Sequence, residues 1–257
     1  MEMKKKNITG LSLGFILFTT GLFIGLAFSS LAAWAHLEGM AFWGYPESIS
    51  FDSNLTREAE LTRLQCPILL TDGEIGTVRL QINNPNETPT RIWVKSHISM
   101  PGRLENMLRR TRSRYLEPGG ESEIRWQVST ENTIHNHMIL VRVFQQRTEH
   151  HPPNQTRHCG IVSANLWGLS SSQILTGTVI STIALLGSGI YTWFRFSSEK
   201  MRESNRVLKV MGAIGTLAVI ALAGSLLRVW QIGFPALILI PIIIISFVSY
   251  HLGRLQL

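Results

Sequence analysis

The chain has 257 residues, of which 45% are hydrophobic and 16% are charged, and its formal net charge is +7. The hydrophobic residues gather into four runs without Asp, Glu, Lys, Arg or His, at residues 7–35, 171–194, 210–227 and 232–250. A helix needs about 20 apolar residues to cross a bilayer, so the composition excludes a purely soluble protein and predicts four membrane-spanning helices.

The net positive charge belongs to the apolar part of the chain. Residues 36–170 contain fourteen Lys and Arg and fourteen Asp and Glu, which cancel. The excess comes from Lys4–Lys6, the segment from Arg195 to Lys209, Arg254, and Arg228, which alone would lie on the outer side. Lys and Arg beside membrane spans mark the cytoplasmic side. We therefore expect a multi-pass protein of the cell membrane with cytoplasmic termini and residues 36–170 outside. This distribution differs from the basic face of a protein that binds nucleic acid.

Residues 1–35 are expected to form a short cytoplasmic tip and the first span. Ala33-Trp34-Ala35 offers a signal-peptidase site, but the apolar run is longer than the roughly 7–15 residues of a signal peptide, so we expect an uncleaved anchor. Gly10, Gly14, Gly21 and Gly25 would let a second helix approach this one closely. That second helix belongs either to this chain or to a partner chain.

Residues 36–65 show no clear period and are expected to form an irregular lead-in, beginning with aromatic residues at the membrane boundary. Apolar and polar residues then alternate in four stretches, which indicates β-strands separated by turns. These stretches lie at residues 77–82, 91–98, 124–128 and 139–143. Several short alternating strands predict an all-β sandwich, which we assign to residues 66–167.

An arginine-rich excursion separates the second and third of these strands. Residues 101–114 contain apolar residues at helical spacing among several arginines. These arginines are candidates for contact with lipid headgroups or an acidic partner: Arg103, Arg109, Arg110, Arg112 and Arg114. The alternative is a solvated loop or short helix without a binding role.

The turns between the strands follow a pattern found in other proteins. One strand ends in Asn84-Pro85, and a later one, Ile124–Val128, follows Leu116-Glu117-Pro118-Gly119-Gly120. Over residues 70–145 this resembles the Ig-like extracytoplasmic repeats of the CARDB and NEW3 type. The resemblance implies a β-sandwich that serves in adhesion, spacing or docking and carries no catalytic residues.

Two cysteines, Cys66 and Cys159, lie near the ends of the predicted outer domain. An oxidising compartment allows a disulfide to persist, so we expect the pair to be bridged, with free thiols as the alternative. His135 and His137 would share one face of a strand, and His158 follows later, so these three are weak candidates for a metal site. No cofactor is expected.

The remaining chain is expected to form three further spans. Gly177 and Ser181 provide small side chains for helix packing in the second span. We assign the second span to residues 168–195, a cytoplasmic loop to 196–209, the third span to 210–229, an outer turn to 230–235, and the fourth span with its cytoplasmic tail to 236–257.

The four apolar runs contain no ionisable side chain, whereas transporters and intramembrane enzymes usually place such groups at membrane depth. The sequence therefore favours a non-enzymatic, membrane-anchored scaffold or docking subunit whose partners are other membrane protein subunits and the lipid bilayer. The alternative is an extracytoplasmic sensor or delivery protein that binds a ligand or a metal.

Overall fold

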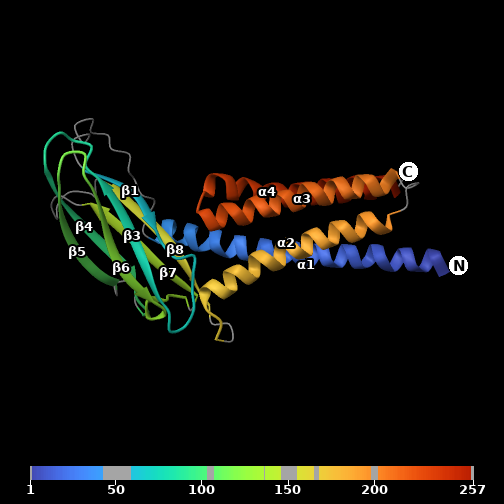
Figure 1. Cartoon of the computed structure of the whole chain (residues 1–257), viewed down its shortest axis with the longest axis horizontal. Helices are drawn as coiled ribbons and strands as arrows, with labels where there is room; N and C mark the ends of the chain where they lie inside the picture. The colour runs from blue at the N-terminus through green and yellow to red at the C-terminus, as the bar shows by residue number, and fades with distance from the viewer. Residues whose placement is uncertain are drawn as a thin grey trace. The chain divides into compact units, whose positions relative to one another are not determined.

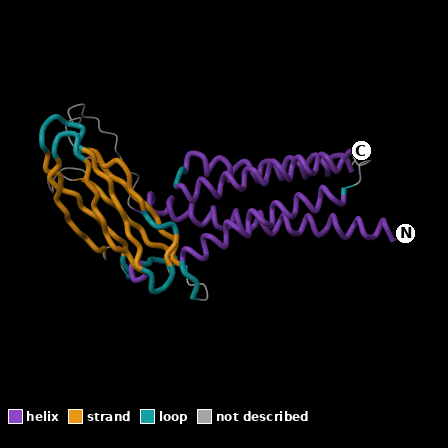
Figure 2. The backbone as a smooth tube through the Cα atoms, in the orientation of Figure 1, coloured by secondary structure: helices purple, strands orange, loops and turns teal. Residues whose placement is uncertain are grey.

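The computed structural model of the chain describes residues 2–42, 59–102, 107–135, 137–145, 155–164, 168–197 and 202–255. The chain divides into two compact units, one made of Met1–Ala33 with Ser172–Leu257 and the other of Trp34–Ser171. The first unit is helical and the second is rich in strands (Figures 1 and 2).

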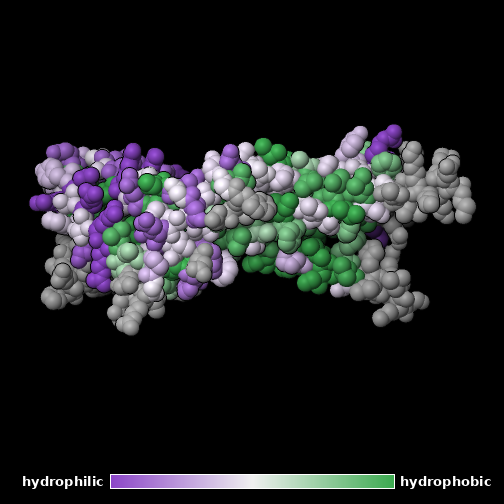
Figure 3. Space-filling model, turned by 90° about the horizontal axis from the view of Figure 1, so that it is seen from below, coloured by the Kyte–Doolittle hydropathy of each residue, from purple (hydrophilic) through white to green (hydrophobic). Residues whose placement is uncertain are grey.

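Four helices contribute to the first unit, which takes in the first of them only as far as Ala33, and all are long and apolar enough to cross a membrane. They are α1 (Glu2–Phe42), α2 (Ser171–Phe196), α3 (Arg202–Leu227) and α4 (Trp230–Leu255). Each contributes to one shared cluster of buried side chains, formed by Phe18, Leu186, Met211, Ile214, Ala218 and Ile240. Hydrophobic residues also cover much of the outer surface of these helices (Figure 3), as expected where lipid is the solvent.

The helices continue beyond the boundaries predicted from hydropathy. The first extends to Phe42 rather than ending at residue 35, and the predicted loop at 196–209 is helical from Arg202 onward. The turn predicted at 230–235 lies instead at Arg228, where the backbone is left-handed with a φ of 57°. Hydropathy reports where side chains stop being apolar, while backbone hydrogen bonding can continue the helix into polar sequence.

Two sheets form the strand-rich unit. The three-stranded sheet has the order β1-β3-β6, with β1 at Glu60–Gln65, β3 at Ile75–Asn83 and β6 at Glu121–Ser129. The five-stranded sheet has the order β2-β8-β7-β4-β5, with β2 at Leu69–Leu70, β8 at Gln155–Ser163, β7 at Met138–Gln145, β4 at Thr90–Ser99 and β5 at Met107–Leu116. The β2–β8 pair is parallel, and the other described pairs are antiparallel. A short 3-10 helix, η2 (Thr130–Asn132), follows β6.

The core of the sandwich comes from the alternating residues of the predicted strands. Trp126 is its largest fully buried side chain, at 1% exposure. The other members from these strands include Val78, Leu80, Ile82, Ile92, Val94, Ile98, Ile124, Val128, Ile139, Val141 and Val143. Residues between them, such as Arg79 and Gln81, are exposed. Alternation with a period of two thus places one apolar face of each sheet against the other.

Several strands were not predicted from the sequence. The predicted lead-in at 36–65 contains the end of α1 and all of β1, and residues 43–58 lie outside the described part. The predicted excursion at 101–114 contains most of β5, and His158 lies in β8, a strand that is not among the four predicted stretches. Edge strands such as β5 and β1 have a neighbour on one side only, so fewer of their side chains are buried and the alternation of apolar residues is weak.

Candidate interaction surfaces

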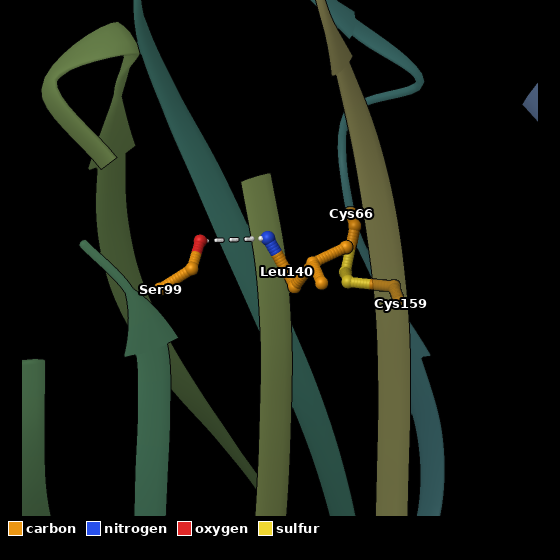
Figure 4. The surroundings of a disulfide bond; sticks show 4 residues. All are labelled: Cys66, Ser99, Leu140 and Cys159. Atoms are coloured by element: carbon orange, nitrogen blue, oxygen red, sulfur yellow. Dashed lines mark hydrogen bonds between the residues drawn. A yellow bond between two sulfur atoms is a disulfide. The ribbon is translucent and has the colours of Figure 1, made fainter. Parts of the chain in front are cut away.

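A disulfide joins Cys66, which follows β1, to Cys159 in β8, with the two Cα atoms 6.6 Å apart. Close to it, the Ser99 hydroxyl accepts a hydrogen bond from the Leu140 N–H at 2.9 Å (Figure 4). The same hydroxyl donates to the Asn132 carbonyl at 2.8 Å. The covalent bond therefore lies beside a buried polar link between β4, β7 and η2.

Asn84 connects the two turn motifs on which the resemblance to CARDB-type repeats rests. Its side-chain amide donates to the carbonyls of Thr88, Leu116 and Glu117 at 3.0, 3.3 and 3.1 Å. Its backbone N–H donates to the Gly120 carbonyl at 3.0 Å. Asn84 is fully buried, and these bonds satisfy its N–H donors and hold the β3–β4 turn against the β5–β6 turn, while its Oδ1 accepts from Asn86.

The last turns of α1, from Trp34 to Phe42, pack on the five-stranded sheet. Ala35 is buried with Met138 and Leu140 of β7. A Cβ on Gly39 would lie 3.2 Å from the backbone of Cys159, and one on Gly160 would overlap the Ala35 carbonyl. Glycine at both positions therefore permits the helix to contact β8 directly.

The three histidines named as weak metal candidates lie in two different elements. His135 is exposed in a turn with a φ of 51°, and His137 lies in the same turn beside Trp34, with ring centroids 5.5 Å apart. They cannot share a strand face as predicted, because the strand begins after them. His158 lies in β8, with its ring centroid 5.2 Å from that of His36. Among the described residues, no group of three or more His, Cys, Asp or Glu could hold a metal ion.

The glycine face of α1 packs on α2 of the same chain. A Cβ on Gly14 would lie 2.9 Å from the backbone nitrogen of Trp193, and one on Gly21 would lie 2.8 Å from Leu185. Gly25 approaches Thr182 at the same distance, and Gly10 lies against the ring of Phe196. The sequence left open whether this face packs on a helix of this chain or of a partner chain. In the structure it packs on a helix of this chain.

A different face of α2 is uncovered. Gly177, predicted to pack against a helix, has no described atom within 4 Å of its Cβ position, and the same is true of Gly187. The Ser181 hydroxyl donates to its own helix, at the Thr178 carbonyl 3.2 Å away. The uncovered α2 face consists of side chains three or four positions apart, all exposed: Gly177, Ile180, Ala184, Gly187 and Tyr191.

The arginine-rich segment is the edge strand β5, not the loop or short helix predicted. It pairs with β4 along its whole length, and Arg109, Arg110, Arg112 and Arg114 are exposed, while Arg103 lies outside the described residues. Charged side chains on an edge strand discourage pairing with the edges of other sheets. This accounts for the alternating arginines at 110, 112 and 114 without a ligand; Arg109 points to the opposite face of the sheet.

Comparisons with solved structures find likeness over less than half of the chain. No family model and no curated protein matches the chain. A CARDB domain from Pyrococcus furiosus, solved in complex with di-metal ions, is 10% identical with a TM-score of 0.34, covering 43% of this chain and 97% of its own.

Two enzymes show a similar degree of likeness. A β-glucosidase from Listeria innocua is 14% identical with a TM-score of 0.31, covering 42% of this chain. An alkylpurine DNA glycosylase from Pseudomonas fluorescens is 13% identical with a TM-score of 0.32 over the same share. The matches span only 16% and 31% of those two proteins. Likeness at this level carries no argument about activity, substrate or partner.

Proposed function

We propose that the chain is a non-catalytic, membrane-anchored docking subunit of a larger membrane protein complex. The observation that carries this proposal is the uncovered α2 face. The α2 helix occupies the space beside the α1 glycines, whereas no described atom lies within 4 Å of the Cβ positions of Gly177 and Gly187. The chain thus uses one set of small residues internally and presents another.

The chemistry of this face fits an apolar helix of a partner subunit. Lipid tails are as apolar as the side chains, so helices associate in membranes through close packing rather than the hydrophobic effect. Two glycines and Ala184 would admit a neighbouring backbone, and Ile180 and Tyr191, at 61% and 67% exposure, would pack beside it. The four apolar runs of the sequence contain no ionisable side chain, which agrees with a structural role rather than with transport.

Co-purification from native membranes in a mild detergent tests this proposal. We expect the wild-type chain to elute with a stoichiometric partner, and Gly187→Leu to lower the yield of that partner at least tenfold. Gly212→Leu is the matched control, because Gly212 also has no described atom within 4 Å of its Cβ position but lies on α3. A lone wild-type monomer, or equal loss in both variants, would contradict the proposal.

We further propose that both termini are cytoplasmic and that residues 36–170 lie outside the membrane. The clustered basic residues at the N-terminus and between Arg195 and Lys209 support this orientation. Alkaline phosphatase fused after residue 170 should be active, because the enzyme matures only in an oxidising compartment. The same enzyme fused after Leu257 should be inactive, and the reverse pattern would overturn the orientation.

A further inference from the structure

Four basic side chains form a row across the five-stranded sheet. The registers pair His158 of β8 with Arg142 of β7, Arg142 with His97 of β4, and His97 with Arg109 of β5. Directly paired residues of antiparallel strands project from the same face of a sheet. The pairings therefore bring residues from positions 97 to 158 into one line, which we call the basic row.

A hollow of about 460 Å³ lies at the β4–β5 end of the basic row. Its lining residues are Lys95, Ser96, His97, Arg109, Arg110, Thr111 and Phe144. Lys95 and Arg109, which are cationic at neutral pH, share one face of the sheet with His97 and the Thr111 hydroxyl, whereas Ser96 and Arg110 project from the opposite face. Among the described residues, the lining contains no Asp or Glu. Guanidinium, ammonium and hydroxyl groups are donors that suit an oxyanion.

Phe144 contacts His97, which lines the hollow, and Arg142, which is its neighbour in the basic row. The His97 ring meets the Phe144 ring edge-to-face, with centroids 4.9 Å apart. The Arg142 guanidinium lies over the same ring, 5.0 Å from its centroid. Such contacts are favourable and fix the planes of the imidazole and guanidinium, so part of the ordering cost of binding is met before a ligand arrives.

The row concentrates positive charge without a described counter-charge at its end. Neither Lys95 nor Arg109 forms an ion pair with any residue that the structure describes. Burial, together with the charges of Arg109, Arg142 and Lys95, lowers the pKa of His97 to about 4. At neutral pH His97 is therefore uncharged, and it lies between the cations Arg142 and Arg109, whose mutual repulsion a bound anion would relieve.

We propose that the hollow between β4 and β5 binds a phosphate-type oxyanion, held by Lys95 and Arg109 with His97 beside them. The oxyanion is either a free phosphate or the headgroup of an anionic phospholipid, which present the same chemistry to these side chains. This site is independent of the uncovered α2 face, so it stands or falls separately from the docking function.

The test uses the full-length protein in a non-ionic detergent at low salt. One arm titrates inorganic phosphate by calorimetry, and the other adds phosphatidylglycerol or phosphatidylcholine and counts bound lipids by native mass spectrometry. Lys95→Gln with Arg109→Gln should weaken anion binding at least tenfold, since two charged donors are lost. Arg112→Gln with Arg114→Gln removes the same charge from the opposite face of β5 and should change binding less than twofold.

Each outcome decides the proposal. Saturable binding of phosphate that depends on Lys95 and Arg109 supports it with a free anion as ligand. Saturable binding of phosphatidylglycerol alone, with the same dependence, supports it with a lipid headgroup. Absence of saturable binding in both arms, or equal weakening by the two double variants, would overturn it. Arg109→Lys should retain most of the affinity, and thermal unfolding by circular dichroism verifies that each variant is folded.

Discussion

Asn84 shows how one residue can organise two distant turns. Its amide donates to carbonyls on both sides of the contact, and its backbone N–H reaches Gly120. A buried amide with several partners stabilises strongly, because losing it leaves several carbonyl groups unpaired. The Asn-Pro and Pro-Gly-Gly motifs that are visible in the sequence are thus two halves of a single contact.

Replacing Asn84 with aspartate keeps its shape but removes the amide donors. A carboxylate oxygen would then face the carbonyls of Leu116 and Glu117, so we expect the free energy of unfolding to fall by about 2–3 kcal/mol. Urea titration followed by tryptophan fluorescence measures this. Asn83→Asp, one residue earlier in β3, is the control and should change stability by less than about 0.5 kcal/mol. Equal effects would show that the hydrogen bonds are not the cause.

Glu74 is the second residue with a structural role that its sequence context does not reveal. Its carboxylate accepts hydrogen bonds from the N–H groups of Thr71 and Ser171, both at 3.0 Å. Ser171 is the first residue of α2, where N–H groups lack partners within the helix. The hydrogen bond from Thr71, followed by those from Ser171, outweighs desolvation and lowers the pKa of Glu74 to about 2.

Glu74→Gln should therefore lower stability by about 0.5–1 kcal/mol at pH 7, the usual value of a charge at a helix N-terminus. The folded state has the lower pKa, so this contribution is complete above pH 4.5 and is lost as pH falls toward about 2. Unfolding of both proteins in urea at pH 7 and pH 3 measures the difference. A gap between wild type and variant that widened on acidification would refute this role.

At the scale of whole elements, one face of α2 packs against another helix and a different face does not. One face packs against the glycines of α1, and a buried Leu186 there joins the cluster shared by the four helices. The other face presents Gly177 and Gly187 with open space. The two kinds of glycine look alike in sequence, and substitution distinguishes them because only one kind has a neighbouring helix.

Gly14→Ala and Gly187→Ala form a matched pair. An added methyl at position 14 would lie 2.9 Å from the Trp193 nitrogen and 3.0 Å from the Gly189 carbonyl oxygen, so the helices must separate. Overpacking of this kind costs about 1–3 kcal/mol. At position 187 the methyl meets open space and should leave stability unchanged or raise it. Thermal unfolding in detergent compares them, and an inverted order would contradict the assigned α1–α2 contact.

For the molecule as a whole, the disulfide closes most of the strand-rich unit into one covalent loop. Cys66 and Cys159 are 93 positions apart, and β2 to β7 lie between them. A bridge over such a long segment restricts the unfolded chain much more than the folded one. The cross-link also joins the segment between β1 and β2 to β8.

Replacing both cysteines with serine should lower the stability of the strand-rich unit by about 4–5 kcal/mol in the chain-entropy account. The wild-type protein under dithiothreitol should approach the same urea midpoint as the double variant. If the variant unfolded at the midpoint of the oxidised wild type, the loop closure would not contribute to stability.

The sequence by itself determined the four apolar helices and the four alternating strands with their core residues. Both follow from local periodicity, because a side chain is buried or lipid-facing according to its place in a repeat of two or 3.6. It also marked the cysteine pair and both turn motifs. The helix ends and the edge strand β5 were placed wrongly, since hydropathy is weak where side chains meet water.

Only the tertiary structure decided which surfaces meet. The glycines of α1 could have faced any helix, and the histidines at 135 and 137 lie in a turn rather than in the predicted strand. The basic row requires the registers of three strand pairs to bring His158, Arg142, His97 and Arg109 together. Register depends on contacts between segments far apart in the chain, so no local pattern contains it.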